Sequence, residues 1–439
     1  MNTPDIVVIG AGPAGMAASI TAAQHGATVT LIDEQPAAGG QIYRALGNSS
    51  TSRARALGKD YAYGNTLLAQ LSSGNVHHVT GATVWSIEAP GTITYSRHSQ
   101  AQQITARHLI IATGALERPY PIPGWTLPGV MTVGAAQILL KTSGLIIDKP
   151  ILAGTGPLLY AVAHQILNAG GTITALVDTV TTAHYYRAAR YLPAGNLKTI
   201  ATGLGYLRAI KKAGVPHYRG ASSVSVIGTQ QAQGIRFTCN NQQVTLQSDT
   251  VLLHQGVVPN TQLSRSLGLS HHWHPVQRCF HPQVNDRGIT SLPSVSLAGD
   301  GTGIGGAINA EHQGAIAALG ALAALGKITE PMYAQLVAKP ARAIQRLARL
   351  RKFLDILYAP AEPCSHPADD TIICRCEEIT AGEIRKVAAT GCIGPNQTKS
   401  FCRSGMGPCQ GRYCGHTVTE ILAATHGLSH NDIGYYRIR

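Results

Sequence analysis

The chain has 439 residues, which is enough for two or three domains, each with its own core. Charged residues make up 13% and aromatic residues 5% of the chain, while glycine occurs 48 times; this composition excludes a disordered protein and favours closely packed α/β layers. The net charge of +13 indicates anionic cofactors or an acidic partner, because no basic run is combined with the stacking aromatic residues of a nucleic-acid site. The longest apolar tract, residues 314–326, is shorter than the ~20 residues that span a bilayer, so we expect no membrane-spanning helix.

The N-terminal segment has the pattern of a dinucleotide-binding βαβ unit. An apolar strand at 6–9 leads into a Gly-x-Gly-x-x-Gly turn, a helix of small residues and a second strand at 27–32. The first glycine permits the tight turn, the second lets a pyrophosphate approach the backbone, and the third lets the helix lie close to the sheet. The helix N-terminus favours phosphate, and an acid after the second strand binds ribose hydroxyls. The residues predicted to contact the dinucleotide are Gly10, Gly12, Pro13, Ala14, Gly15, Asp33 and Glu34.

Three later segments favour FAD over NAD at this first site. A second backbone loop follows the acid closely, a strand at 109–112 ends in a short turn, and a strand from 295 ends at an acid before a glycine-rich helix start. In this order the segments specify a flavoprotein, with the last acid near the ribityl chain and the last helix N-terminus near the flavin ring. The additional FAD residues predicted are Gly40, Gln41, Thr113, Gly114, Gly299 and Asp300.

A second nucleotide-binding unit begins near residue 150. Its glycine turn contains Gly154 and Gly156, and a strand predicted at 172–177 ends at Asp178. Leu159 replaces the third glycine, so the ligand stays open between NAD(P) that is turned over, a non-catalytic adenine nucleotide and no ligand at all. The cysteine pairs used by thioredoxin and glutathione reductases are missing from the sequence, which excludes their dithiol chemistry.

An amphipathic helix is predicted at 339–358, followed by an exposed linker at 360–370. We interpret the helix mainly as a packed connector with a solvated basic face, and its alternative as a docking face for a partner. The apolar side is predicted to contain Ile344, Leu347, Leu350 and Leu354, and the basic side Arg342, Arg346 and Arg349.

Four cysteines near the C-terminus form a Cys-x-Cys pair, Cys374 and Cys376, and a Cys-x₄-Cys pair, Cys409 and Cys414. Soft thiolates are the ligands of iron–sulfur clusters, and four of them complete a [2Fe–2S] centre. Structural zinc, with its usual Cys-x₂-Cys spacing, and ordinary buried thiols are the alternatives. Among the other five cysteines, only Cys402 lies close enough in sequence to approach the cluster.

The predicted architecture is therefore an α/β flavoprotein with two dinucleotide-binding domains, like glutathione and thioredoxin reductases, and a small helical [2Fe–2S] domain. Histidines 271, 272 and 274 are interpreted as a polar loop rather than a metal site, and no set of residues looks like a substrate base. The predicted domains are FAD-binding residues 1–145, a second nucleotide domain at 146–255, an FAD return segment at 256–330, a helix and linker at 331–370, and a [2Fe–2S] domain at 371–439.

Several segments carry a resemblance to a known family: residues 33–44, 112–119, 123–131 and 152–157, together with the cysteine region. The chain resembles the FAD and [2Fe–2S] subunit of heteromeric bacterial octopine or nopaline oxidase, D-hydroxyproline dehydrogenase and cyanide synthase, and more distantly the alpha subunit of heterotetrameric sarcosine oxidase. The resemblance covers nearly the whole chain. Its stretch at 33–44 is more similar to the opine and D-hydroxyproline members than to cyanide synthase.

The resemblance implies a division of labour within an FAD-dependent oxidoreductase. A D-amino-acid-oxidase-like partner, with or without a small third subunit, would oxidise a C–N bond of D-hydroxyproline or an opine-like secondary amine at its own flavin. Electrons would then pass through this subunit's FAD and cluster to the respiratory chain or a ferredoxin-like carrier. The resemblance also adds FMN, bound at a subunit interface, to the cofactors considered. It implies that this chain holds no catalytic residue for the substrate.

Three alternatives stay open on the sequence. The chain could be a self-contained NAD(P)H:acceptor reductase, a cyanide synthase subunit, or a non-enzymatic redox or iron sensor. Few cysteines and an N-terminus without a secretory pattern lead us to expect a reducing compartment, the cytoplasm, either free or peripheral to the inner membrane.

Overall fold

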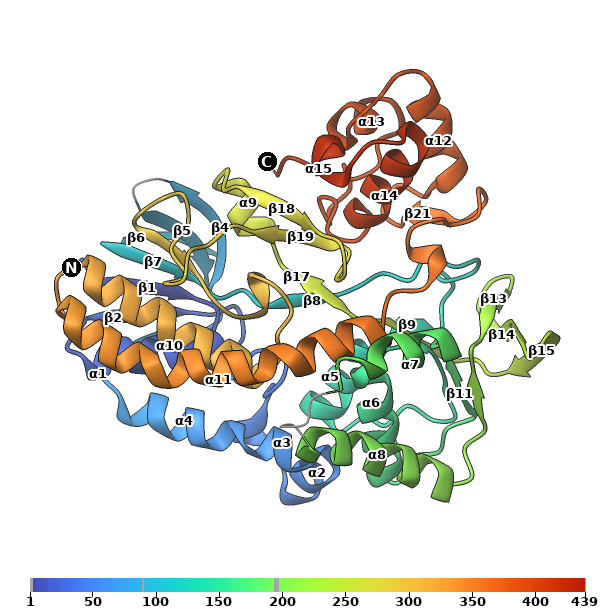
Figure 1. The fold of residues 1–439 in the computed structure, drawn as a ribbon, viewed down its shortest axis with the longest axis horizontal. Coiled ribbons are helices and arrows are strands. Elements are labelled where there is room, and N and C mark those ends of the chain that lie inside the picture. Colours follow the sequence, from blue (N-terminus) through green and yellow to red (C-terminus); the bar gives the residue numbers. More distant parts are fainter. Residues whose placement is uncertain (1–2, 89–90, 193–196, 439) are drawn as a thin grey trace.

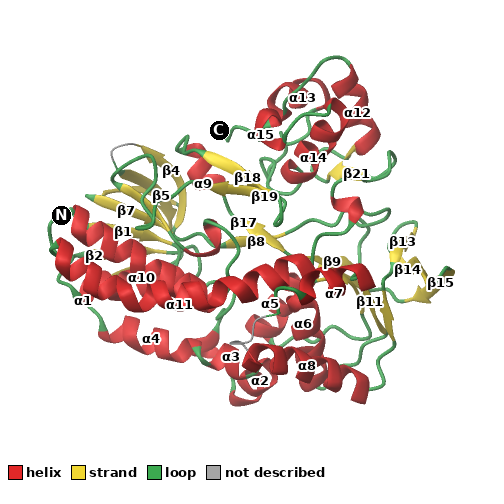
Figure 2. Ribbon diagram, in the orientation of Figure 1, coloured by secondary structure: helices red, strands yellow, loops and turns green. Residues whose placement is uncertain are grey.

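The computed structural model describes residues 3–88, 91–192 and 197–438 (Figure 1). Two five-stranded parallel sheets carry helices, and a helical domain lies at the C-terminal end (Figure 2). This arrangement confirms the predicted fold class, a flavoprotein with two dinucleotide-binding domains and a small C-terminal helical domain.

The first sheet has the strand order β20-β7-β1-β2-β3. Its strands β1 and β2 are apolar and buried throughout, as expected for a parallel sheet covered on both faces. Helices pack on one face and an antiparallel sheet of three strands on the other. The strands are β1 (Ile6–Ile9), β2 (Val29–Ile32), β3 (Val76–Val79), β7 (His108–Ile111) and β20 (Val295–Leu297), the helices α1 (Pro13–Gln24), α2 (Thr51–Leu57), α3 (Lys59–Ala62), α4 (Gly64–Ser73) and α10 (Ala307–Ala324), and the covering strands β4 (Thr83–Glu88), β5 (Thr92–Arg97) and β6 (Gln100–Thr105).

The second sheet has the order β12-β11-β10-β16-β9 and forms the second nucleotide-binding domain. Its predicted strand at 172–177 is β11, which begins and ends slightly later, at Ala175–Asp178. The other strands are β9 (Val130–Thr132), β10 (Ile151–Thr155), β12 (His217–Arg219) and β16 (Val251–Gln255), the helices α5 (Val133–Ser143), α6 (Pro157–Asn168), α7 (Thr182–Ala189) and α8 (Leu197–Lys212), and an attached antiparallel sheet consists of β13 (Ser222–Gly228), β14 (Ala232–Cys239) and β15 (Gln242–Gln247).

Two short strand pairs lie between the first sheet and the C-terminal domain (Figure 1). One of them, β18 with β19, corrects the expectation of a polar loop at histidines 271, 272 and 274. The segment is extended because its rings pack as a half-buried surface: His271 lies against Tyr435, and Trp273 stacks on His430 with ring centroids 4.0 Å apart. The elements here are β8 (Ala115–Glu117) with β17 (Val257–Pro259), β18 (His271–His274) with β19 (Cys279–Pro282), and α9 (Gln262–Ser266).

The long helix α11 (Glu330–Leu357) begins earlier than the predicted 339–358, because Thr329 caps it and Pro340 lies inside it without ending it. Its three predicted arginines are exposed and Leu350 is buried. The following linker is not fully exposed as expected. Cys364, in the short helix η3 (Glu362–Cys364), is only 6% exposed because its apolar side chain packs into the core of the second domain.

The C-terminal domain has its own small core, built around α12 and α14. Ile384, Val418 and Leu422 are fully buried there, so the domain has an apolar centre independent of the flavoprotein body. Its elements are β21 (Ile372–Cys374), β22 (Ile379–Thr380), α12 (Ala381–Ala389), α13 (Pro395–Cys402), α14 (Gly415–His426) and α15 (His430–Ile433).

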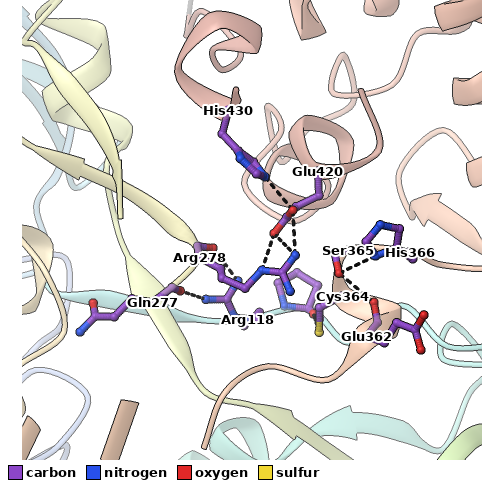
Figure 3. A network of polar contacts seen from close by, with 10 residues as sticks. Arg118, Gln277, Arg278, Glu362, Cys364, Ser365, His366, Glu420 and His430 are labelled. Carbon is purple, nitrogen blue, oxygen red and sulfur yellow. Dashed lines mark hydrogen bonds and ion pairs between the residues drawn. The ribbon is translucent and has the colours of Figure 1, made fainter. Parts of the chain in front are cut away.

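A buried carboxylate fastens this domain to the flavoprotein body (Figure 3). Glu420, on α14, accepts two hydrogen bonds of 2.9 Å from the guanidinium of Arg278 and one of 2.8 Å from Nε2 of His430. Arg118 extends the network by donating to the backbone oxygens of Gln277 and Arg278. We call Arg278, Glu420 and His430 the Glu420 clamp.

The clamp has a defined dependence on pH. Burial acts to raise the pKa of Glu420, but the hydrogen bonds from His430 and Arg278 outweigh it, so the pKa lies below its ordinary value. A lowered pKa stabilises the folded state above the unfolded value of about 4.3, and this contribution is lost as the pH falls through the folded value.

Replacing Glu420 by Gln keeps the shape of the side chain and removes its charge. We expect docking of the C-terminal domain to weaken by about 1–3 kcal/mol, the order found for hydrogen bonds to charged groups. Limited proteolysis within residues 358–370, on protein that retains FAD and iron, measures the weakening. The difference from wild type should shrink as the pH falls through the lowered pKa of Glu420, where the wild-type carboxylate also becomes protonated.

The matched control is Glu330→Gln, because Glu330 forms a similar paired contact with Arg287 but lies on the surface. Exposed ion pairs contribute little, so this variant should be cleaved at the wild-type rate. Equal cleavage of the Glu420 variant and wild type at neutral pH would contradict the role of the clamp.

Candidate cofactor sites

The predicted pyrophosphate loop lies between β1 and α1, where two glycines are required by close backbone contacts. A Cβ on Gly10 would lie 2.5 Å from the carbonyl oxygen of Ala112, and a Cβ on Gly15 would collide with the carbonyl of Gly10. Pro13 and Ala14 follow in the first turn of α1, with Pro13 at the position where a missing N–H costs nothing. The loop is therefore held against the ends of β1 and β7.

Gly12 has a different role from these packing glycines. A Cβ added to it would meet only the Cα of Gly40, at 3.8 Å, so its side faces open space. Gly40 has φ +58 and lies against Gly12 so closely that its own Cβ would be 2.7 Å from the Gly12 Cα. Two bare backbone segments thus line one cradle, which fits a pyrophosphate that must approach N–H groups directly.

The two predicted ribose acids are held differently. Asp33 follows β2 and is 8% exposed, and its carboxylate accepts hydrogen bonds from Ala11 N at 2.5 Å and Gln35 N at 2.7 Å. Burial raises the pKa of Asp33 above its ordinary value. A carboxylate has about four acceptor positions, so Asp33 can still accept from a ribose hydroxyl while it braces the loop. Glu34 is exposed beside it.

The predicted flavin end of the cleft brings together three separate segments. Thr113 and Gly114, after β7, bond to the backbone of Asn260, while Gly299 and Asp300 form the turn η2 (Gly299–Gly301). Asp300 is partly buried there. Its carboxylate accepts from the N–H groups of residues 305 and 306, and burial raises its pKa.

Lys141 is a residue of this region that no sequence pattern indicated. It is 2% exposed on α5, and its Nζ donates to the carbonyl of Gln41 at 3.0 Å and to Oε1 of Gln137 at 2.8 Å. Burial, with a smaller contribution from the charge of Arg44, lowers the pKa of Lys141 to about 7. A single lysine in an apolar helix gives no sequence signal, because only the fold places it beside the Gly40-Gln41 loop.

Valine substitutions at Gly12 and at Gly15 distinguish a loss of FAD binding from a loss of folding stability. Gly12→Val should fold, because Gly12 has a φ of −74 that any residue adopts, but its side chain fills the cradle and FAD should be lost by at least about tenfold in occupancy. Iron should be retained, since the cysteines lie in another domain. Flavin absorbance and iron per chain measure both effects.

Gly15→Val should instead destabilise the FAD domain itself, because the new side chain collides with the Gly10 carbonyl. Thermal unfolding distinguishes the two variants. Gly203→Val on α8, where a Cβ meets nothing within 4 Å, is the control and should keep both FAD and stability. Full FAD occupancy in Gly12→Val would show that FAD does not bind at the cradle of Gly12 and Gly40.

The second nucleotide-binding unit is closed at the position where a dinucleotide would enter. Asp178, predicted to bind ribose, is completely buried, and its carboxylate accepts from the hydroxyl of Tyr160 and from Val180 N at 2.9 Å. Gly154 and Gly156 are in place, but the first lies against the backbone of His254 and the second against its imidazole ring. The acid and the turn therefore both have partners from the chain itself.

The chain after α11 covers this crevice. Ala361 N donates to Oε1 of Gln255, the last residue of β16, at 2.9 Å, and Leu357 packs on Val180 and Ala188. The ring of Tyr358 lies 6.1 Å from that of Tyr160. Ligands of doubly wound sheets bind outside the carboxyl ends of the strands, so the segment from Leu357 to Ala361 lies in the region a second dinucleotide would need.

The four predicted cluster ligands lie close together as two pairs of thiols. Cys374 lies close enough to Cys414, and Cys376 to Cys409, for the thiols of each pair to shift one another's pKa. Across the described residues, no group of three or more His, Cys, Asp or Glu side chains is arranged around one ion. Two pairs match the two irons of a [2Fe–2S] centre, each of which takes two thiolates, better than they match zinc.

One thiol of the inner pair, Cys374, is prepared to ionise, whereas the contact with Cys374 and burial raise the pKa of Cys414 well above the ordinary value. The pKa of Cys374 is lowered to about 6, first by the hydrogen bond with Cys414 and further by backbone N–H groups of Gly405, Glu377 and Cys376. The Gly405 N–H lies 3.4 Å from the sulfur. Backbone donors of this kind also stabilise a cluster's sulfur ligands, so the loop fits an anionic iron–sulfur group.

Two of the glycines around the cysteines serve a purpose that the sequence did not indicate. Gly405 and Gly411 both lie against the ring of Tyr436, where an added Cβ would come within 2.6 Å. Tyr436 is 2% exposed and its hydroxyl is bonded to Ser404. Gly407 lies directly against the side chain of Cys376, and the N–H of Gly405 donates to the sulfur of Cys374.

Serine substitutions test the ligand assignment. Cys409→Ser should lose at least about half of the iron while FAD stays at wild-type occupancy, because a hydroxyl is a poor replacement for a soft thiolate. Cys402→Ser is the matched control: Cys402 is on α13, and its thiol is bonded to Thr398 and Ser404 rather than to the four ligands. Iron and acid-labile sulfide per chain measure the outcome, and equal iron loss in both variants would contradict the four-cysteine assignment.

Two family models match this chain. The pyridine nucleotide-disulphide oxidoreductase family matches residues 4–314, and the BFD-like [2Fe-2S] binding domain matches residues 372–424. The two matches coincide with the FAD cradle and with the cysteine pairs. The fold and site thus define an FAD-dependent oxidoreductase with an attached [2Fe–2S] domain.

Within that class, the chain belongs to a family of opine oxidase subunits. It is 42% identical to an opine oxidase subunit of Agrobacterium tumefaciens (strain Ach5), over 99% of this chain and 89% of that protein. It is also 30% identical to Hydrogen cyanide synthase subunit HcnB of Pseudomonas protegens, over 99% and 94%. The crystal structure of L-proline dehydrogenase from P. horikoshii shares the fold, with a TM-score of 0.70 at 16% identity over 100% of this chain and 77% of that one.

These similarities establish the coarse function. The protein is a flavin and [2Fe–2S] subunit of an amino-acid or opine oxidase, and its relatives are subunits of larger enzymes. Among the helices that the structure describes, none has the length and apolar character needed to cross a membrane.

Proposed function

We propose that this chain is the electron-transfer subunit of a heteromeric dehydrogenase that oxidises D-hydroxyproline or an opine-like secondary amine. The observation that carries the proposal is the contrast between the two nucleotide sites: the FAD cradle is open, while the second crevice is covered by residues 357–361. Electrons must then reach the flavin from a source other than NAD(P)H. A substrate-oxidising partner is the source that the relatives' names suggest.

The proposal assigns each part of the chain a task. The cradle of Gly12 and Gly40 holds FAD, and the cysteine loop holds the cluster. FAD accepts electron pairs and a [2Fe–2S] centre passes single electrons, so the two together connect a two-electron oxidation to a one-electron acceptor. The Glu420 clamp keeps the two domains at a fixed separation.

The partner is proposed to be a D-amino-acid-oxidase-like flavin subunit that carries the substrate site, with or without a third small subunit. The acceptor is proposed to be the respiratory chain or a ferredoxin-like carrier, and the complex to be cytoplasmic, either free or at the inner membrane surface. Support comes from the opine oxidase relative of Agrobacterium tumefaciens, whose name states that it is one subunit of an enzyme. FMN at the subunit interface belongs to the same proposal.

Stopped-flow reduction tests the proposal. Mixed anaerobically with NADH or NADPH, the isolated chain should keep its oxidised flavin spectrum for at least about a hundred times longer than a catalytic turnover, which typically takes about 0.1 s. With the partner subunit present, D-hydroxyproline or an opine should bleach the flavin within seconds. Rapid bleaching by either nicotinamide nucleotide would favour the self-contained reductase instead.

The same complex separates the remaining alternatives. Reduction of a one-electron acceptor should be lost in Cys409→Ser while flavin bleaching persists, because the cluster follows the flavin in the relay. Release of cyanide during turnover would identify the chain as part of a cyanide synthase. By contrast, the sensor alternative predicts no flavin reduction by any substrate even with the partner bound.

A further inference from the structure

Three histidines gather on one face of the β18–β19 hairpin. His272 and His281 are directly opposite each other in the strand register, and their ring centroids are 5.8 Å apart. His274 lies two residues further along β18, hence on the same face, and its ring stacks on that of His281 at 4.6 Å. The other face of the hairpin, with Trp273 and Phe280, packs on rings of the C-terminal domain. The three imidazoles therefore lie on the side away from that domain.

On that side, His281 lies against the loop of the predicted flavin end. A Cβ added to Gly303 would come within 2.9 Å of Cε1 and Nδ1 of His281. The same loop supplies the N–H groups of residues 305 and 306 that bind the carboxylate of Asp300. Gln277, between the two strands, binds this loop twice: its side chain donates to the carbonyl of Ile304 at 3.0 Å and accepts from Ile304 N at 3.1 Å. The hairpin is thus fixed on the glycine-rich segment between η2 and α10.

The exposure of the three rings differs in a useful way. His281 is 8% exposed, and within the described residues its Nε2 is buried without a hydrogen-bond partner. His274 is half-buried, and His272 is exposed. A buried polar atom without a partner is costly and rare in native proteins, so such an atom indicates a ligand or a role in proton transfer. The unpartnered nitrogen belongs to the inner ring of a group of imidazoles that reaches solvent.

The surroundings keep the two inner rings neutral. Burial, followed by the effects of His274 and His272, lowers the pKa of His281 to about 3. Burial also lowers the pKa of His274, against the opposing charge of Asp355, which is itself paired with Arg351. A neutral imidazole has one donor and one acceptor nitrogen. It can therefore accept a proton at one nitrogen and release a proton from the other without holding a charge.

The proposed electron relay requires a route for a proton as well. A flavin reduced by a hydride equivalent holds two electrons and one added proton, and its oxidation, FADH⁻ to FAD, releases both electrons and that proton. A [2Fe–2S] centre takes up the electrons one at a time and no proton. When both electrons leave through the cluster, the proton freed from the flavin N–H bond must reach solvent by a separate path.

We propose that His281, together with His274 and His272, is the path by which the flavin's proton reaches solvent. His281 takes up the proton released at the flavin end and releases a proton from its other nitrogen, and the outer rings pass it to water at the surface of the hairpin. This inference rests on the proposed function and on the predicted position of the flavin end at Asp300.

Proton release can be measured on the full chain, loaded with FAD and cluster and reduced anaerobically with stoichiometric dithionite. Mixing with ferricyanide in weakly buffered solution oxidises the flavin, and an indicator dye records the released protons beside the flavin absorbance. His281→Ala should slow flavin oxidation and proton release together by at least about tenfold, the lower range for a lost proton transfer, with FAD and iron at wild-type levels. His77→Ala, at an exposed histidine on β3, is the matched control and should behave like wild type.

Rescue by a small base distinguishes a proton path from a packing role. His281→Ala leaves the space of one ring, so added imidazole should restore the rate toward that of wild type. Tris, a base too large for this space, should not restore it. Wild-type rates in His281→Ala, or slow rates that imidazole leaves unchanged, would overturn the proposal.

The double variant His272→Gln with His274→Gln covers the case in which His281→Ala does not fold, because both outer rings keep accessible surface. It should slow the same step by at least about tenfold, and wild-type rates in it would count equally against the proton path. The measurement needs neither the partner subunit nor a substrate. Rapid flavin reduction by NADH would refute the electron-transfer function without changing this result, so the two failures are distinguishable.

Discussion

The contact between Glu420 and its two cationic partners is the constraint on which the working arrangement of this molecule depends. Each domain has its own apolar core, so the position of one relative to the other depends on the contacts between them. What the clamp determines is the separation and orientation of two cofactor sites, and electron transfer requires both to be fixed. A carboxylate that is 6% exposed and accepts three hydrogen bonds holds that geometry more firmly than surface ion pairs do.

The segment that follows α11 both lies over the crevice of the second nucleotide domain and connects the body to the cluster domain. A doubly wound domain leaves a crevice at the carboxyl ends of its strands, and here residues 357–361 lie in it. The connector is thereby ordered on its way to the cluster domain, and Trp125 of the body bonds to the backbone of Ile372 at 2.7 Å where that domain begins. The segment that lies over this crevice is therefore the same segment that leads into the cluster domain.

A residue's role could be predicted from the sequence when it depends on neighbours along the chain, and could not when it depends on residues that only the fold brings close. The glycine turn between β1 and α1 was predictable because a tight turn and a close backbone approach leave a spacing signature. The closure of the second crevice was not, because Tyr160 and Asp178 look ordinary until the fold places the hydroxyl on the carboxylate. Tyr436 and Lys141 were missed for the same reason, and the histidines at 271–274 were misread because their partners, Tyr435 and His430, lie far along the chain.

The two thiol pairs differ in exposure, because one pair is buried and the other is partly open to solvent. Cys374 and Cys414 are each 1% exposed, whereas Cys376 is exposed and Cys409 partly so. Phe401, on α13, and Tyr413, between Cys409 and Cys414, are exposed at 71% and 48%. The inner thiols belong to the core of the domain that the clamp presses against the flavoprotein body. The residues that would hold a cluster therefore comprise one buried pair and one pair that solvent can reach.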